Sequence, residues 1–131
     1  MNLLLDTHIW LWSVLEPQRL TRRVAGELTS AKNQLWLSPV SVWELHLLVR
    51  RKRIELDEQL ESWVRKTLEN LQLNEAPFTV DVALAVAELN LPHSDPADQF
   101  LIASARIFGL TLVTADELLL RTAGVQTLAN R

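Results

Sequence analysis

The chain has 131 residues, a length typical of one domain, and 48% of them are hydrophobic, enough for a sizeable core. The absence of Cys excludes disulfides, thiolate zinc sites, iron–sulfur clusters and cysteine nucleophiles, and it is compatible with a cytoplasmic protein. The formal charge of −3 argues mildly against a nucleic-acid partner. No apolar run approaches the ~20 residues of a membrane span, and Asp6 interrupts the N-terminal one, so we expect neither a membrane anchor nor a signal peptide.

Short apolar runs alternate with longer segments of helical periodicity. The apolar runs predict strands at 3–5, 35–37 and 111–114, with weaker candidates at 76–78 and 125–128. The periodic segments predict helices, each opened by residues suited to a helix N-terminus: Asp6, Thr21, Ser38-Pro39, Asp57, Thr79, Asp95-Pro96 and Asp116. The helix after Asp95-Pro96 should stop before Gly109. This alternation is typical of an α/β fold with a mainly parallel sheet, in one domain over residues 1–131.

Four acids fall where a parallel α/β sheet gathers its ligands, at the carboxyl ends of the strands. Asp6 directly follows the first predicted strand, and Asp116 follows the strand at 111–114. Asp98 lies in the first turn of a predicted helix. Glu44 lies about one and a half turns into the helix after Ser38-Pro39. If the sheet is parallel, these four side chains converge on one edge from separate parts of the chain.

Helix capping is an alternative explanation for three of these acids. Asp6 and Asp116 could be N-caps, and Asp98 would be favoured by the helix dipole at its position. Glu44 has no such role, and its sequence neighbours predict that it is buried among apolar side chains. A carboxylate there is unfavourable unless it is protonated, paired or bound to a cation. The alternative to a cation would be a buried arginine, for which Arg106 is the candidate.

A cluster of four carboxylates is tolerable only around a strong cation. Two unit charges ~4 Å apart repel by about 4 kcal/mol at an effective dielectric of 20. Oxygen ligands favour Mg²⁺ or Mn²⁺, and the three His show no zinc-site spacing. Such metals promote phosphodiester or phosphoester hydrolysis, and the Thr7 and Thr114 hydroxyls could stand beside the cluster. Bound cations would also offset much of the negative formal charge.

Four segments carry these acids in a characteristic order along most of the chain. They are Leu5-Asp6-Thr7-His8, Trp43-Glu44-Leu45, His93-Ser94-Asp95-Pro96-Ala97-Asp98 and Val113-Thr114-Ala115-Asp116. Together they resemble the motifs of PIN-domain ribonucleases, specifically the VapC-like toxins of bacterial type II toxin–antitoxin systems.

The resemblance implies a three-layer α/β/α fold and an endoribonuclease that depends on Mg²⁺ or Mn²⁺. It further implies a cognate antitoxin partner and a homodimer. The metal-binding acids would be Asp6, Glu44, Asp98 and Asp116, and Asp95 would be first a helix cap and second a support for the metal ligands. The sequence departs from the pattern at Gln99, where toxins of this type often have Arg.

A basic run and several tryptophans are further candidates for contacts at the surface or in the core. The run Arg50, Arg51, Lys52 and Arg53 is either a solvated helix end or a contact to the RNA backbone. Trp10 and Trp12 lie two residues apart on one short helix, so at least one should be near the surface, available to a dimer or antitoxin contact. Trp36 and Trp63 are expected in the core.

Three functions compete at this point. The leading hypothesis is a metal-dependent endoribonuclease acting as a toxin. The second is a catalytically silent domain of the same fold that binds RNA or protein. The third is another metal-dependent phosphoester hydrolase, acting on small molecules or DNA.

Overall fold

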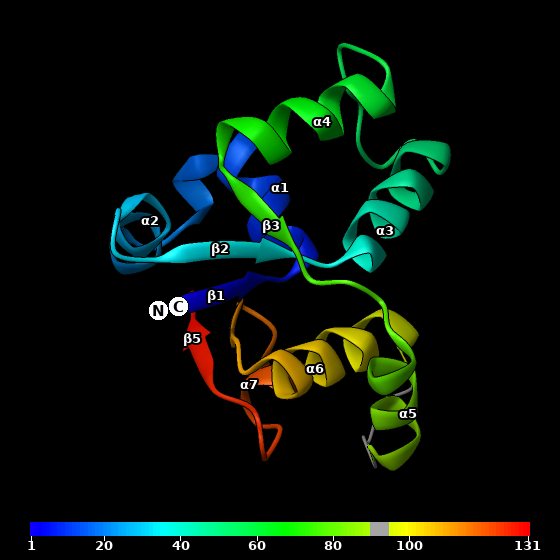
Figure 1. Ribbon diagram of the computed structural model, residues 1–131. Coiled ribbons are helices and arrows are strands. Elements are labelled where there is room, and N and C mark those ends of the chain that lie inside the picture. Colours follow the sequence, from blue (N-terminus) through cyan, green and yellow to red (C-terminus); the bar gives the residue numbers. More distant parts are fainter. Residues whose placement is uncertain (90–94) are drawn as a thin grey trace.

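A central parallel sheet organises the chain, as a computed structural model of residues 1–89 and 95–131 shows (Figure 1). The described residues form five strands in the spatial order β3-β2-β1-β4-β5. Every neighbouring pair is parallel, so the predicted α/β class is confirmed. The strands are β1 (Asn2–Leu5), β2 (Gln34–Leu37), β3 (Leu73–Glu75), β4 (Thr111–Thr114) and β5 (Thr127–Ala129).

Helices connect these strands, and most of them begin at the predicted caps. They are α1 (Thr7–Leu15), a 3₁₀ turn η1 (Pro17–Arg19), α2 (Arg22–Thr29), α3 (Pro39–Arg50), α4 (Leu60–Asn70), α5 (Val80–Glu88), α6 (Pro96–Phe108) and α7 (Glu117–Leu120). The side chains of Thr21, Ser38 and Thr79 each accept a hydrogen bond from a backbone N–H in the first turn. Gly109 ends α6 with φ +65°, a conformation that favours glycine.

Two local predictions are wrong. The helix expected to start at Asp57 has Gln59 as its N-cap, with no hydrogen bond from the cap side chain, so α4 begins without a side-chain cap. The edge strand expected at 76–78 lies at Leu73–Glu75 instead, where it pairs with β2. This edge strand is largely exposed, and a short exposed strand lacks the continuous apolar run that marks a central one.

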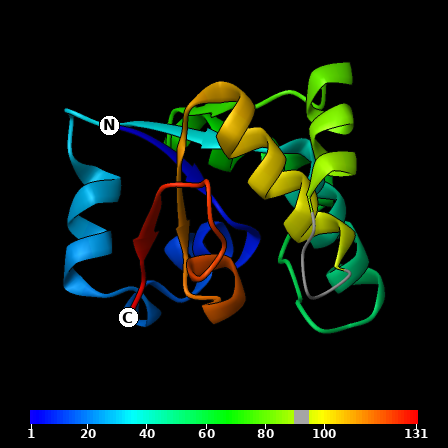
Figure 2. The same cartoon turned by 90° about the horizontal axis from the view of Figure 1, so that it is seen from below.

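Helices cover both faces of the sheet and make three layers. Leu3 and Leu5 of β1 point into one core, which includes Trp10, Leu45 and Trp63 from α1, α3 and α4. The intervening residue Leu4 packs on the other face against α6 and α7. All three leucines are fully buried, because β1 is central and covered on both sides. The α5 helix packs along α6, as two perpendicular views show (Figures 1 and 2).

The sheet changes winding direction at β1. From this strand the chain passes to β2 on one side, whereas β4 pairs with it on the other. In open α/β sheets the crevice outside the carboxyl ends of two such strands is the usual ligand site. The backbone N–H of Asp6 donates to the carbonyl of Val113 at 3.1 Å, so β1 and β4 are held together up to this crevice. Within the described parts of the chain, no helix is long and apolar enough to cross a membrane.

Candidate active site

A cavity of about 340 Å³ opens at this carboxyl edge. The four acids singled out from the sequence, Asp6, Glu44, Asp98 and Asp116, all line it. They come from the end of β1, from α3, from the first turn of α6 and from the end of β4. The predicted convergence is therefore present, and it joins segments that are distant in sequence.

Asp6 is the most enclosed of these acids, with 7% of its surface exposed. One carboxylate oxygen accepts the backbone N–H of Ile9 at 3.0 Å, which makes Asp6 the N-cap of α1. The other oxygen accepts the hydroxyl of Thr114. Burial raises the pKa of Asp6 above its ordinary value, and these hydrogen bonds oppose that rise. Asp6 is thus both a helix cap and a desolvated carboxylate facing the cavity.

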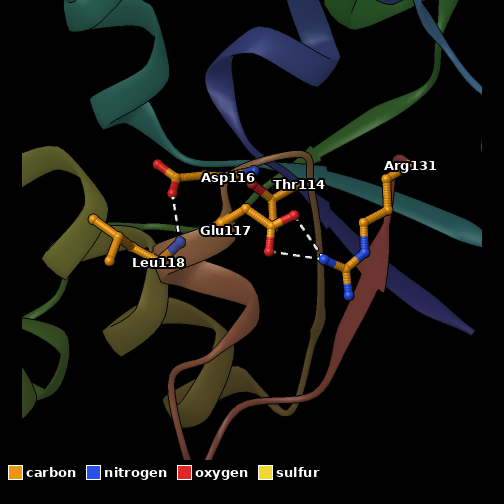
Figure 3. Close-up of polar contacts among 5 residues, drawn as sticks. All are labelled: Thr114, Asp116, Glu117, Leu118 and Arg131. Carbon is orange, nitrogen blue, oxygen red and sulfur yellow. Dashed lines mark hydrogen bonds and ion pairs between the residues drawn. The ribbon is translucent and has the colours of Figure 1, made fainter.

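The Thr114 hydroxyl connects two of the acids. Besides donating to Asp6, it accepts the backbone N–H of Asp116 at 3.0 Å. The Asp116 carboxylate in turn accepts the N–H of Leu118 at 2.8 Å and caps α7 (Figure 3). The next residue, Glu117, turns away and holds Arg131 at 2.6 and 2.7 Å (Figure 3). Of the two neighbouring acids, only Asp116 lines the cavity, because Glu117 is engaged with Arg131.

Glu44 is held by neighbouring hydroxyl groups. The Thr7 hydroxyl donates to its carboxylate and also lies 2.8 Å from the Ser41 hydroxyl. Partial burial raises the pKa of Glu44, the Thr7 hydrogen bond opposes this, and the nearby negative charges of Asp95 and Asp6 raise it further. Sequence reasoning missed Ser41, which is buried one helical turn before Glu44. Its spacing of three residues from the acid on one helix was the available signal.

The expected burial of Glu44 is wrong. Its side chain is half-buried rather than enclosed by apolar groups, and the adjacent Trp43 is 52% exposed. Both follow from the position of α3, which covers the sheet with one face and leaves the other in solvent. Arg106, the alternative partner, does not line the cavity, and its guanidinium lies beside Gly124.

The α6 helix places two further acids at the cavity. Asp95 caps the helix by accepting the N–H of Ala97 at 3.0 Å, and its exposed side chain lines the cavity. Asp98 is half-buried in the first helical turn. The remaining part of the predicted turn, His93 and Ser94, lies outside the described residues.

The donor chemistry of the cavity suits a hard divalent cation. Its acids and the supporting hydroxyls offer only oxygen, the ligand that Mg²⁺ and Mn²⁺ prefer. His8 lines the same cavity, and its charge lowers the pKa values of Asp6 and Glu44. Within residues 1–89 and 95–131, however, no three acidic or histidine side chains are already arranged as a metal centre. In the structure, Asp6 and Glu44 accept hydroxyl hydrogen bonds, while Asp116 and Asp95 cap helices.

The basic run at the end of α3 separates into two parts. The helix ends at Arg50, Arg51 is its C-cap, and Lys52 adopts φ +57°, so the backbone turns sharply there. These residues are exposed, which both a solvated helix end and a contact to the RNA backbone require. Arg53, after the turn, lines a second groove that adjoins the acidic cavity.

Of the tryptophans, Trp10 and Trp63 are buried, whereas Trp12 and Trp36 are half-buried, so Trp36 is less enclosed than expected.

Comparison with known proteins agrees with this fold. Residues 3–125 match the family model of the PIN domain. The chain is 34% identical over 118 residues to the ribonuclease VapC22 of Mycobacterium tuberculosis, covering 88% of this chain and 87% of that protein.

Solved structures share the fold at lower sequence identity. One is VapBC2 from Rickettsia felis bound to a DNA fragment from its promoter, with a TM-score of 0.75, 19% identity and 98% coverage of both chains. Another is DNA-bound VapBC from Salmonella typhimurium, with a TM-score of 0.71, 17% identity and 98% coverage of both chains. The family-model match spans nearly the whole chain, and the chain therefore belongs to the PIN-domain family, with a VapC ribonuclease among its relatives.

Proposed function

We propose that this protein is a metal-dependent endoribonuclease that acts in the cytoplasm as the toxin of a toxin–antitoxin pair. The observation that carries the proposal is the convergence of Asp6, Glu44, Asp98 and Asp116 on one cavity at the carboxyl edge of the sheet. The relationship to a ribonuclease of the VapC type supports RNA as the substrate.

The four acids would hold Mg²⁺ or Mn²⁺. When bound, such an ion polarises a phosphoryl oxygen and lowers the pKa of water. The chain's own contribution is to position the ligands. The Thr7 hydroxyl orients Glu44, and Thr114 orients Asp6, so two of the four carboxylates are fixed before metal binding. Asp95 lines the same cavity, where its negative charge would add to the attraction for the cation.

Burial of the carboxylates links metal binding to proton release. Desolvation raises the pKa values of Asp6 and Glu44, so protons compete with the cation for these oxygens. An oxygen-rich cavity with raised pKa values is a site where a cation replaces protons. We therefore expect cleavage to weaken as the pH falls toward the range in which these acids are protonated.

The proposed partners are a cognate antitoxin and a second copy of the chain. The related solved structures of VapBC complexes support an antitoxin. An apolar surface on α5 supports the homodimer, because Val80 and Leu84 lie one turn apart and are 74% and 62% exposed.

The test is cleavage of a labelled single-stranded RNA with Mn²⁺, with Mg²⁺ and with a chelator. Wild type should cleave only with metal, and Asp6→Asn or Glu44→Gln should reduce the rate by at least a hundredfold. Glu69→Gln on α4 alters an exposed acid away from the cavity and should cleave like wild type. Equal cleavage by wild type and both cavity variants would overturn the proposal.

One observation favours a second candidate, a silent domain that binds RNA without cutting it. No three acids among the described residues are pre-arranged around a cation position. This candidate expects RNA binding that is the same with metal and with chelator, and no cleavage products from wild type. The same experiment therefore separates the two functions.

A further inference from the structure

A second groove continues from the acidic cavity along α1. It has a volume of about 500 Å³, and it shares two lining residues, His8 and Trp12, with the cavity of the four acids. Its far side is formed by Arg53, just after the sharp turn that follows α3. An RNA strand bound across the four acids would therefore pass Trp12 where it leaves the cavity toward this groove.

The shared wall of the groove is built from planar side chains. The guanidinium of Arg19 lies over the Trp12 ring, with its carbon 4.4 Å from the ring centroid. On the same helix, the His8 ring lies 5.8 Å from the Trp12 ring at an interplanar angle of 51°. Glu16 forms an ion pair with Arg19 at 3.2 Å. A half-buried indole with a guanidinium stacked on it is a prepared surface for another flat group.

The charges of the groove differ from those of the cavity. Arg19 and Arg53 are balanced by Glu16 and Glu55, whereas the cavity is lined by acids and one histidine. A neutral, flat nucleobase suits the balanced groove, and Arg53 offers a cation to the phosphate attached to it. The apolar lining, which includes Leu11 and Ile54, supports the base rather than a second phosphate.

We propose that this groove binds one unpaired nucleotide next to the scissile phosphate, with its base stacked on the Trp12–Arg19 pair and its phosphate near Arg53. The proposal rests on the function proposed above. It adds a binding site for the nucleotide beside the one that is cut. Stacking needs an exposed base face, so the groove would accept single-stranded RNA and reject a duplex.

The test compares Trp12→Leu with Trp12→Phe on a pool of single-stranded RNAs with randomised sequence. Leucine keeps an apolar side chain but removes the aromatic plane, whereas phenylalanine keeps the plane. Trp12→Leu should raise KM roughly tenfold with kcat nearly unchanged. Trp12→Phe should keep the KM and kcat of wild type. Arg65→Ala on α4 removes an exposed arginine outside the groove and serves as the charge control.

A binding measurement without metal makes the proposal independent of cleavage. In the presence of a chelator, labelled single-stranded RNA should bind wild type and Trp12→Phe about equally, and Trp12→Leu roughly tenfold more weakly. If wild type binds in this way but cuts nothing, base binding in the groove stands and the nuclease proposal falls. If Trp12→Leu binds and cuts like wild type, the groove does not hold a base, and a protein segment becomes its occupant.

Because Trp12 also packs against the core, the melting temperature of each variant is measured first. If Trp12→Leu does not fold, Arg19→Met replaces it, because Arg19 is exposed and methionine keeps length without the guanidinium plane. Arg19→Met should weaken single-stranded RNA binding severalfold and leave duplex binding unchanged. Unchanged single-stranded binding by Arg19→Met would overturn the proposal.

Discussion

The hydroxyl of Thr114 donates a hydrogen bond to the carboxylate of Asp6, across 108 residues of sequence. This contact joins the last residue of β4 to the N-cap of α1. Because the same hydroxyl accepts the backbone N–H of Asp116, one side chain positions two acids of the cavity. Both strands are in the centre of the sheet, so the contact is supported by a rigid core.

Replacement of Thr114 by valine should show how much this contact contributes to stability and to cleavage. Valine has nearly the same shape but leaves the buried Asp6 carboxylate without its hydroxyl donor, which should cost about 1–3 kcal/mol of stability at pH 7. Cleavage should fall at least tenfold, since Asp6 loses its fixed orientation. Thr111→Val, on the same strand, removes an exposed hydroxyl and is the matched control in urea unfolding and RNA cleavage. Equal effects of the two substitutions would contradict the assigned role.

The raised pKa of Asp6 predicts how stability depends on pH in a metal-free buffer. Because burial raises this pKa above 3.8, the folded chain binds the Asp6 proton more tightly than the unfolded chain does. The contribution of Asp6 to stability is therefore full below 3.8 and is lost as the pH rises through the folded pKa. Asp6→Asn should gain stability relative to wild type over that window, measured by urea unfolding with a chelator.

Glu44→Gln should also gain stability relative to wild type as the pH rises. The stability that Glu44 contributes to wild type should begin to be lost near the ordinary pKa of 4.5. Its effect should be smaller, because Glu44 is less buried than Asp6 and is closer to solvent screening. A stability difference that shrinks as the pH rises, for either variant, would contradict the assigned direction.

Much of the fold follows from local sequence signals. The run at 3–5 predicted the central strand because a strand covered on both faces needs apolar residues at every position. Capping residues such as Thr79 and Asp95 marked helix starts through hydrogen bonds that depend on neighbouring residues alone. The edge strand β3 was misplaced because its exposed residues have no apolar run, and its pairing with β2 is a tertiary contact.

The candidate site was predictable in its acids and less so in their surroundings. Strand ends and helix starts place Asp6 and Asp116 at one edge once the sheet is known to be parallel. The burial of Glu44 could not be judged from neighbours in sequence, because α3 turns one face to solvent. The contact of Thr7 with Ser41 and Glu44 depends on how α1 and α3 pack, which no local pattern contains.

Metal binding should stabilise the folded chain. A cation that binds the folded state alone adds about 2.7 kcal/mol at a concentration one hundred times its Kd, so Mn²⁺ should raise the melting temperature of wild type by several degrees. Asp6→Asn should shift far less, because it removes one of the proposed ligands. The measurement is a thermal melt with Mn²⁺, with Ca²⁺ and with a chelator. A shift of the same size in Asp6→Asn would place the bound ion elsewhere.

The exposed face of α5 predicts a concentration-dependent dimer. Val80→Glu and Leu84→Glu put charges on this apolar surface and should shift the chain to a monomer in sedimentation equilibrium. Both side chains are exposed and neither lines the acidic cavity, so the fold and the acid site should be retained. The matched control is Val14→Glu on α1, another exposed apolar residue on a different part of the surface. A dimer that survives both α5 substitutions would exclude this helix as the contact.

The central position of β1 affects when the crevice forms during synthesis and when it is lost during degradation. Asp6 is made early in synthesis, but the crevice beside it exists only after β4 has been made and has paired with β1. Such long-range pairing is slow compared with helix formation. A chain still on the ribosome, or one cut by a protease between α1 and β4, would carry Asp6 without a completed crevice. Nuclease activity would then be the last property gained during biogenesis and the first one lost during degradation.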